Sequence, residues 1–172
     1  AFPECEWHGA DPVSETIVWA RENLPKISFI ASPQRPPIPY ADSYFDGVYA
    51  ISVWSHFRED VALEWFTEMH RIIAPNGFLA FTAPGYTKAA NQLRGKPEIL
   101  PKIERRIQRL QKTGYAFGST HKAKGPLDNQ FWGSTELTLT WVVKNLVGPW
   151  SLRKLVPAGN RLQQDIYILQ RV

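Results

Sequence analysis

The chain has 172 residues, of which 44% are hydrophobic and 21% are charged. This composition is close to the average of soluble globular proteins and excludes an intrinsically disordered chain. The single cysteine, Cys5, excludes an internal disulfide framework, and the sequence lacks the run of about 18 apolar residues that would span a membrane. We therefore expect one folded, cytoplasmic domain over residues 1–172, with no membrane partner.

The excess of positive charge is small, with a formal net charge of +4 and an isoelectric point near 9.3. Lysine and arginine are spread along the chain except between Lys102 and Lys112. A solvated helix face explains this basic stretch more simply than a nucleic-acid contact, so we expect no nucleic-acid partner. The one cysteine and four scattered histidines lack the spacing of metal ligands, so we expect no metal site.

The first half of the chain alternates short apolar runs with helical patterns. Apolar residues recur at helical spacing in Val13–Asn23 and Arg58–Ile73, and Pro75-Asn76-Gly77 is expected to stop the second helix. A proline-rich loop, residues 33–39, cannot be helical. The pattern predicts strands at Glu4–His8, Ile27–Ala31, Gly47–Val53 and Phe78–Thr82. Strands that alternate with helices predict βαβ units and an α/β sheet.

The second half is less regular. A basic amphipathic helix is predicted over Pro97–Thr113, with Gly114 as its stop. Ser134–Leu146 is ambiguous, since its apolar residues alternate as in a strand while Ser134 suits a helix N-cap; we favour the helix. Trp150–Val156 and Asp165–Gln170 are predicted to be two closing strands, because turn-forming residues lie between them.

Three segments together resemble the class I S-adenosylmethionine-dependent methyltransferase family. The segment from Pro36 to Phe57 is similar to the family's pattern of a proline-containing loop, Phe-Asp, a buried strand and a histidine. The segment from Glu68 to Leu79 resembles the family's helix, its Pro-Gly-Gly-type turn and its fifth strand. Trp7–Asp11 is similar to the acidic second motif. The resemblance covers essentially the whole chain.

The resemblance implies a Rossmann-like, mostly parallel sheet flanked by helices, with an antiparallel closing strand pair. Residues 86–147 would be an insertion between the fifth strand and that pair, on the substrate side. The family's first strand and its glycine-rich cofactor loop precede the acidic motif, so the domain in residues 1–172 is expected to be N-terminally incomplete. Because that strand lies at the centre of the sheet, its absence would leave backbone groups unpaired. We expect an upstream segment to supply it, rather than a different segment to fill the gap.

The resemblance also implies S-adenosyl-L-methionine as cofactor and assigns residues to its binding. Asp11 would accept hydrogen bonds from the ribose hydroxyls, as carboxylates at strand ends do in nucleoside sites. The alternative for Asp11 is a simple helix cap. Ser32 would lie against the adenine, and the methionine portion would pass Ala50, Ile51 and Ser52.

His56 is the candidate catalytic base, because it follows the buried strand at the face where such sheets bind ligands and an imidazole exchanges protons near neutral pH. The alternative is that His56 orders the turn into the next helix. Within the insertion, Tyr115, Asp128 and Trp132 are candidate substrate-binding residues. The alternative for the aromatic side chains is that they pack the insertion onto the sheet.

These assignments predict methyl transfer to a small-molecule or saccharide-type acceptor, at oxygen. Two alternatives stay open. One is a catalytically inactive methyltransferase-like module that binds a partner through the insertion. The other is an RNA methyltransferase, which would use the basic helix and bind RNA with a steep salt dependence.

Overall fold

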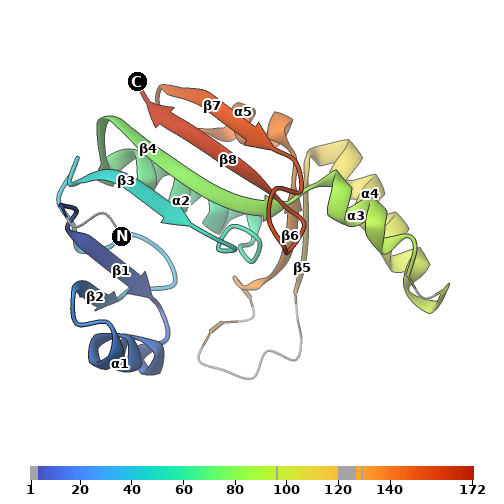
Figure 1. Ribbon diagram of the computed structural model, residues 1–172. Helices are drawn as coiled ribbons and strands as arrows, with labels where there is room; N and C mark the ends of the chain where they lie inside the picture. The colour runs from blue at the N-terminus through green and yellow to red at the C-terminus, as the bar shows by residue number, and fades with distance from the viewer. Residues whose placement is uncertain (1–3, 96, 120–126, 129) are drawn as a thin grey trace.

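The computed structural model describes residues 4–95, 97–119, 127–128 and 130–172 (Figure 1). The strands of the first half of the chain belong to two separate sheets, and the predicted insertion packs beside them. The mixed α/β class and the antiparallel closing pair are confirmed. No helix within these residues is long and apolar enough to cross a membrane.

A small N-terminal unit consists of strand β1 (Trp7–Asp11), helix α1 (Ser14–Asn23) and strand β2 (Ile27–Ala31). The two strands pair in parallel, with Trp7 opposite Ile27 and Asp11 opposite Ala31. Helix α1 buries only Ile17 and Ala20 and exposes most of its remaining surface. The predicted strand Glu4–His8 was placed too early, and the observed strand reaches Asp11.

The larger sheet has the strand order β3-β4-β8-β7. Strands β3 (Phe45–Ala50) and β4 (Ile73–Pro84) are parallel, while β8 (Gln164–Arg171) runs antiparallel to both β4 and β7 (Trp150–Val156). Helix α2 (Glu59–Ile72) links β3 to β4 and lies across one face of this sheet (Figure 1). No hydrogen-bonded ladder joins β1 to β3 among the described residues, so the sheet is in two parts.

The turn Pro75-Asn76-Gly77 differs from its prediction. Helix α2 already ends at Ile72, and the chain enters β4 at Ile73, so the turn lies within the strand. Asn76 has a φ of 67°, and a Cβ at Gly77 would lie 2.8 Å from the carbonyl oxygen of Asp46. Glycine is therefore needed here because the neighbouring strand β3 passes too closely for a side chain.

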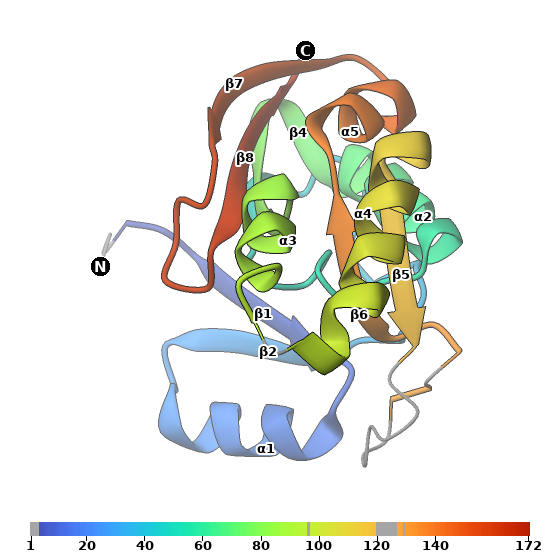
Figure 2. The ribbon, with the colours of Figure 1, turned by 90° about the vertical axis from the view of Figure 1, so that its right-hand side faces the viewer.

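The predicted insertion contains helices and a hairpin: α3 (Tyr86–Gln92), the 3₁₀ turn Pro97–Ile99, α4 (Leu100–Thr113), β5 (Tyr115–Ser119), β6 (Gly133–Leu137) and α5 (Leu139–Asn145). Figure 2 shows α3 and α4 side by side, with α4 along β5. Gly114, with a φ of 78°, ends α4 as predicted. The helix predicted over Ser134–Leu146 is wrong in its first half, because β6 pairs with β5 there.

The hydrophobic core lies between the α2 side of the larger sheet and the insertion. Phe66 of α2 stacks on Trp54 at 5.0 Å, and Phe81 of β4 stacks on Tyr167 of β8 at 4.7 Å. Trp141 of α5 joins the same cluster and contacts Tyr115 at 4.4 Å between ring centroids. The insertion is thus part of the main core.

Candidate functional site

The segment after β3, residues 51–58, is the histidine loop. Three backbone hydrogen bonds fasten it to the insertion: Arg58 N donates to Phe131 O at 2.9 Å, Gly133 N to His56 O at 2.7 Å, and Thr135 N to Ser55 O at 2.8 Å. The loop therefore lies between the sheet and the start of β6. Open α/β sheets bind their ligands at this carboxyl end of the parallel strands.

His56 is held by one hydrogen bond and one stacking contact. Its Nδ1 lies 2.8 Å from the carbonyl oxygen of Gly133, and its ring stacks on Trp132 with centroids 4.9 Å apart and an interplanar angle of 7°. A carbonyl oxygen only accepts hydrogen bonds, so Nδ1 must carry the proton. In the neutral ring this leaves the lone pair on Nε2, which is the nitrogen available to take up a proton.

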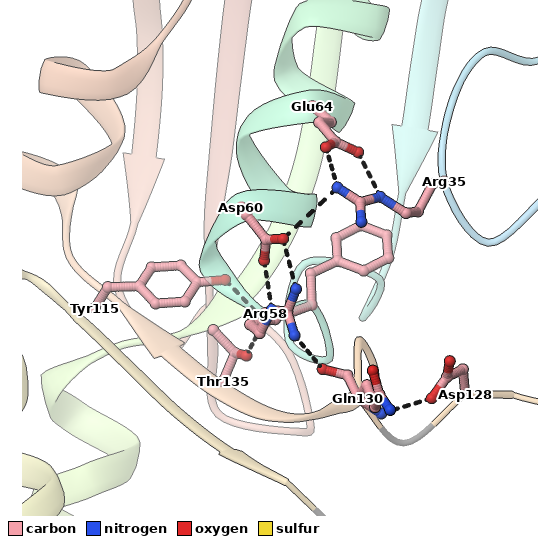
Figure 3. Close-up of polar contacts among 9 residues, drawn as sticks. Arg35, Arg58, Asp60, Glu64, Tyr115, Asp128, Gln130 and Thr135 are labelled. Carbon is pink, nitrogen blue, oxygen red and sulfur yellow. Dashed lines mark hydrogen bonds and ion pairs between the residues drawn. The ribbon is translucent and has the colours of Figure 1, made fainter.

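A cluster of two arginines and two carboxylates, the arginine clamp, fixes the residue before Trp132 (Figure 3). Arg58 makes a bidentate contact with Asp60 at 2.6 and 2.7 Å, and Arg35 pairs with Glu64. Both guanidinium carbons lie 5.0 Å from the ring centroid of Phe131. The hydrogen bonds from Arg58 lower the pKa of Asp60 to about 2. The Arg58–Asp60 pair therefore stays ionised at neutral pH, and the two guanidiniums hold the ring of Phe131 next to Trp132.

Four polar side chains form a network where β3 and β4 end. Ser52 N donates to Thr82 Oγ1 at 2.8 Å, Thr82 donates to the amide oxygen of Gln164 at 2.6 Å, and the amide nitrogen of Gln164 donates to Ser52 Oγ at 2.9 Å. Ser55 Oγ lies 3.0 Å from Ser52 Oγ. Ser52 has a φ of 61°, which the network holds in place.

Sequence reasoning identified only Ser52 among these four residues. Thr82 carried a usable signal, since it is a hydroxyl residue within the apolar run of β4. Ser55 and Gln164 carried no comparable signal, because their roles depend on partners far away in the sequence.

Asp11 and Ser32 lie together at the ends of β1 and β2. The amide of Ser32 donates to the carbonyl oxygen of Asp11 at 3.0 Å. Asp11 Oδ1 accepts a hydrogen bond from Val13 N at 2.7 Å, in the turn just before α1, and α1 has no side-chain cap. No other hydrogen bond to this carboxylate occurs within the described residues. The hydrogen bond to Val13 N orients the carboxylate, and a contact of its second oxygen with a ribose diol stays a prediction.

Ala50 and Ile51 differ in exposure. Ala50 is buried within the core, so only its backbone can face a ligand, while Ile51 is 57% exposed. With Ser52 they bring the chain from the interior of β3 to the histidine loop. Their contact with the methionine portion of a cofactor stays a prediction.

The three candidate substrate residues occupy different environments. Tyr115 is buried, and its hydroxyl donates to the carbonyl oxygen of Phe57 at 2.8 Å; burial also raises its pKa. Asp128 is exposed and accepts a hydrogen bond from Gln130 N at 2.8 Å. Trp132 alone touches His56. Tyr115 and Asp128 thus have structural partners, and a substrate contact for any of the three stays a prediction.

Residues 2–81 match the model of a methyltransferase domain family. This segment runs from β1 into β4 and contains Asp11, Ser32, Ser52 and His56. Over this segment, which is slightly under half of its length, the chain is similar to methyltransferase domains.

Solved methyltransferase structures share the fold of this chain across nearly its whole length. A SAM-dependent methyltransferase from Methanosarcina mazei is 16% identical with a TM-score of 0.59, over 96% of this chain and 81% of that one. The N-methyltransferase NodS from Bradyrhizobium japonicum, in complex with S-adenosylhomocysteine, is 13% identical with a TM-score of 0.57, over 99% and 69%.

A third structure is the 1,6-didemethyltoxoflavin-N1-methyltransferase of Burkholderia thailandensis with bound 1,6-didemethyltoxoflavin and S-adenosylhomocysteine. It is 11% identical with a TM-score of 0.58, over 96% of this chain and 60% of that one. No protein of curated function matches the chain. At these identities the likeness establishes the fold alone.

Proposed function

We propose that this chain is a methyltransferase that transfers the methyl group of S-adenosylmethionine to a small molecule, with His56 as the base. The observation that carries the base assignment is the hydrogen bond from His56 Nδ1 to the carbonyl oxygen of Gly133. It leaves Nε2 as the basic nitrogen at the carboxyl end of β3. The stacking on Trp132 limits rotation of the ring and so keeps that nitrogen in one direction.

The chemistry of methyl transfer gives the cofactor and the protein different roles. The cofactor supplies an electrophilic methyl group, so the protein mainly aligns the two reactants. Asp11 would hold the ribose hydroxyls through its second carboxylate oxygen, with Ser32 beside it. His56 Nε2 would take the proton that the acceptor loses when its new bond to carbon forms.

A small-molecule acceptor is supported by the named relatives, one of which has 1,6-didemethyltoxoflavin bound. The expectation of transfer to oxygen stays a prediction, and two of these relatives are nitrogen methyltransferases by name. The binding module without activity and the RNA methyltransferase are the competing proposals. RNA affinity that falls steeply between low and moderate salt would favour the latter.

Calorimetric titration with S-adenosylhomocysteine tests the cofactor assignment. We expect Asp11→Ala to weaken binding by about 1–3 kcal/mol, because ribose hydroxyls lose their acceptor. The matched control is Glu15→Ala, which removes an exposed carboxylate from the first turn of α1 and should leave the affinity unchanged. His56→Asn should also retain binding, since His56 is assigned to proton transfer. A folded protein that binds no S-adenosylhomocysteine would instead favour the inactive module.

A further inference from the structure

A pocket lies where the closing strand pair meets the insertion. Its volume is about 310 Å³. It lies next to the end of β4, because Tyr86 follows directly on Pro84 and Gly85. Its walls combine apolar and polar side chains, among them Tyr86, Leu137, Thr138, Leu155, Asp165 and Tyr167.

Asp165 is the only charged residue among the described residues that line this pocket. Its Oδ1 accepts a hydrogen bond from Ala158 N at 2.8 Å, which fixes the carboxylate to the turn between β7 and β8. A Cβ at Gly85 would overlap Oδ2, so the other oxygen packs against the backbone at the end of β4. Partial burial raises the pKa of Asp165. A carboxylate in this position is short of hydrogen-bond donors.

Tyr167 provides an independent sign that the pocket lacks a partner. The side chain is fully buried, and its ring stacks on Phe81. Its hydroxyl has no hydrogen-bond partner within the described part of the chain. Burial raises its pKa, and the charge of Asp165 raises it further, so the two groups lie within electrostatic reach of each other. A buried hydroxyl without a partner and a carboxylate with a single donor are both costly, so this lining is short of polar contacts.

We propose that this pocket binds a small organic amine with an apolar body. The ammonium group would pair with Asp165, and the body would lie against Leu137 and Leu155. The ligand should be positively charged, because a carboxylate without a neighbouring cation among the lining residues attracts cations and repels anions. The size follows from the volume, which matches a molecule of one ring and a short chain. The proposal concerns binding alone, so it stands whether or not methyl transfer is found.

Methyl-resolved NMR tests the proposal with three probes of matched size: 2-phenylethylamine, 2-phenylethanol and 3-phenylpropanoate. We expect the amine to shift the methyl resonances of Leu137 and Leu155 and to bind at least tenfold more tightly than the alcohol, with the propanoate weakest. Asp165→Asn should weaken the amine at least tenfold and leave the alcohol within about twofold. The matched control is Asp46→Asn, which removes an exposed carboxylate from β3.

Tyr167→Phe serves as the second variant, because it keeps the ring packing and removes only the unpaired hydroxyl. We expect it to fold and to weaken the amine severalfold. The proposal is overturned if the amine leaves Leu137 and Leu155 unshifted, or if it binds no better than the alcohol. It is equally overturned if a folded Asp165→Asn protein binds the amine as tightly as the unchanged protein, which would make Asp165 only a turn residue.

Discussion

The N-terminal β1–α1–β2 unit and the larger sheet with α2 are packed very differently. Helix α1 buries two residues, whereas α2 buries six and the strand β4 is buried along most of its length. Asp11 belongs to the first region, and His56 lies in the loop between β3 and α2 of the second. The candidate site for the cofactor ribose is therefore on the weakly packed part, while the candidate base is on the strongly packed part. Regions with few buried contacts open at lower free energy, so cofactor binding is expected to stabilise the N-terminal unit most.

The largest effect in this comparison is expected for Phe66→Ala in α2. Phe66 is fully buried and stacks on Trp54, so the substitution leaves a cavity in the main core. We expect the free energy of unfolding to fall by about 3–5 kcal/mol in urea titrations. Ile17→Ala, the matched change in α1, should cost only about 2 kcal/mol, at the low end for a buried isoleucine. Equal losses would show that the two regions are packed alike.

A smaller effect is expected for Phe131→Ala, which removes the ring held by the arginine clamp. Trp132 then loses its fixed neighbour, and the stacking on His56 loosens. We expect the ring nitrogens of His56 to change from one tautomer to a mixture, measured by ¹⁵N NMR of the imidazole. Phe131→Trp keeps an aromatic face for both guanidiniums and should preserve the single tautomer. An unchanged spectrum in Phe131→Ala would mean that the Gly133 hydrogen bond holds His56 by itself.

The smallest effect is a pH dependence centred on His70 of α2. Its Nε2 is buried without a partner among the described residues, and burial lowers its pKa, with a further lowering by Arg171. The unfolded chain therefore binds more protons than the folded one as the pH falls below about 6.5, the ordinary pKa of histidine. Stability should decline from pH 7 toward pH 5, and His70→Phe should flatten that decline in thermal melts. A slope identical in both proteins would assign it to other groups.

Local patterns predicted several elements of the fold well, because these elements are defined by near neighbours in sequence. The strand Ile27–Ala31 matches β2, and the predicted helix Arg58–Ile73 differs from α2 by one residue at each end. The closing strand Trp150–Val156 matches β7. Periodicity sufficed here because each element buries one regular face or one continuous apolar run.

The hairpin β5–β6 could not be predicted in the same way. Gly133–Leu137 becomes a strand because it pairs with Tyr115–Ser119, and no local sequence pattern predicts that pairing. The same limit applies to the site. His56 was predicted from its place after a strand. Its contact with Gly133 and the contacts of the two clamp arginines with Phe131 were not, because each of them joins residues separated by more than 70 positions.

The three backbone hydrogen bonds that fasten the histidine loop to the insertion have a consequence for engineering. They join main-chain atoms, so they do not depend on which side chains occupy residues 55–58 and 131–135. Substitutions at the half-buried positions among these residues should therefore alter the chemistry displayed at the loop while its attachment persists. Libraries that vary side chains on both segments together, with glycine kept at position 133, offer a direct route to new acceptor preferences.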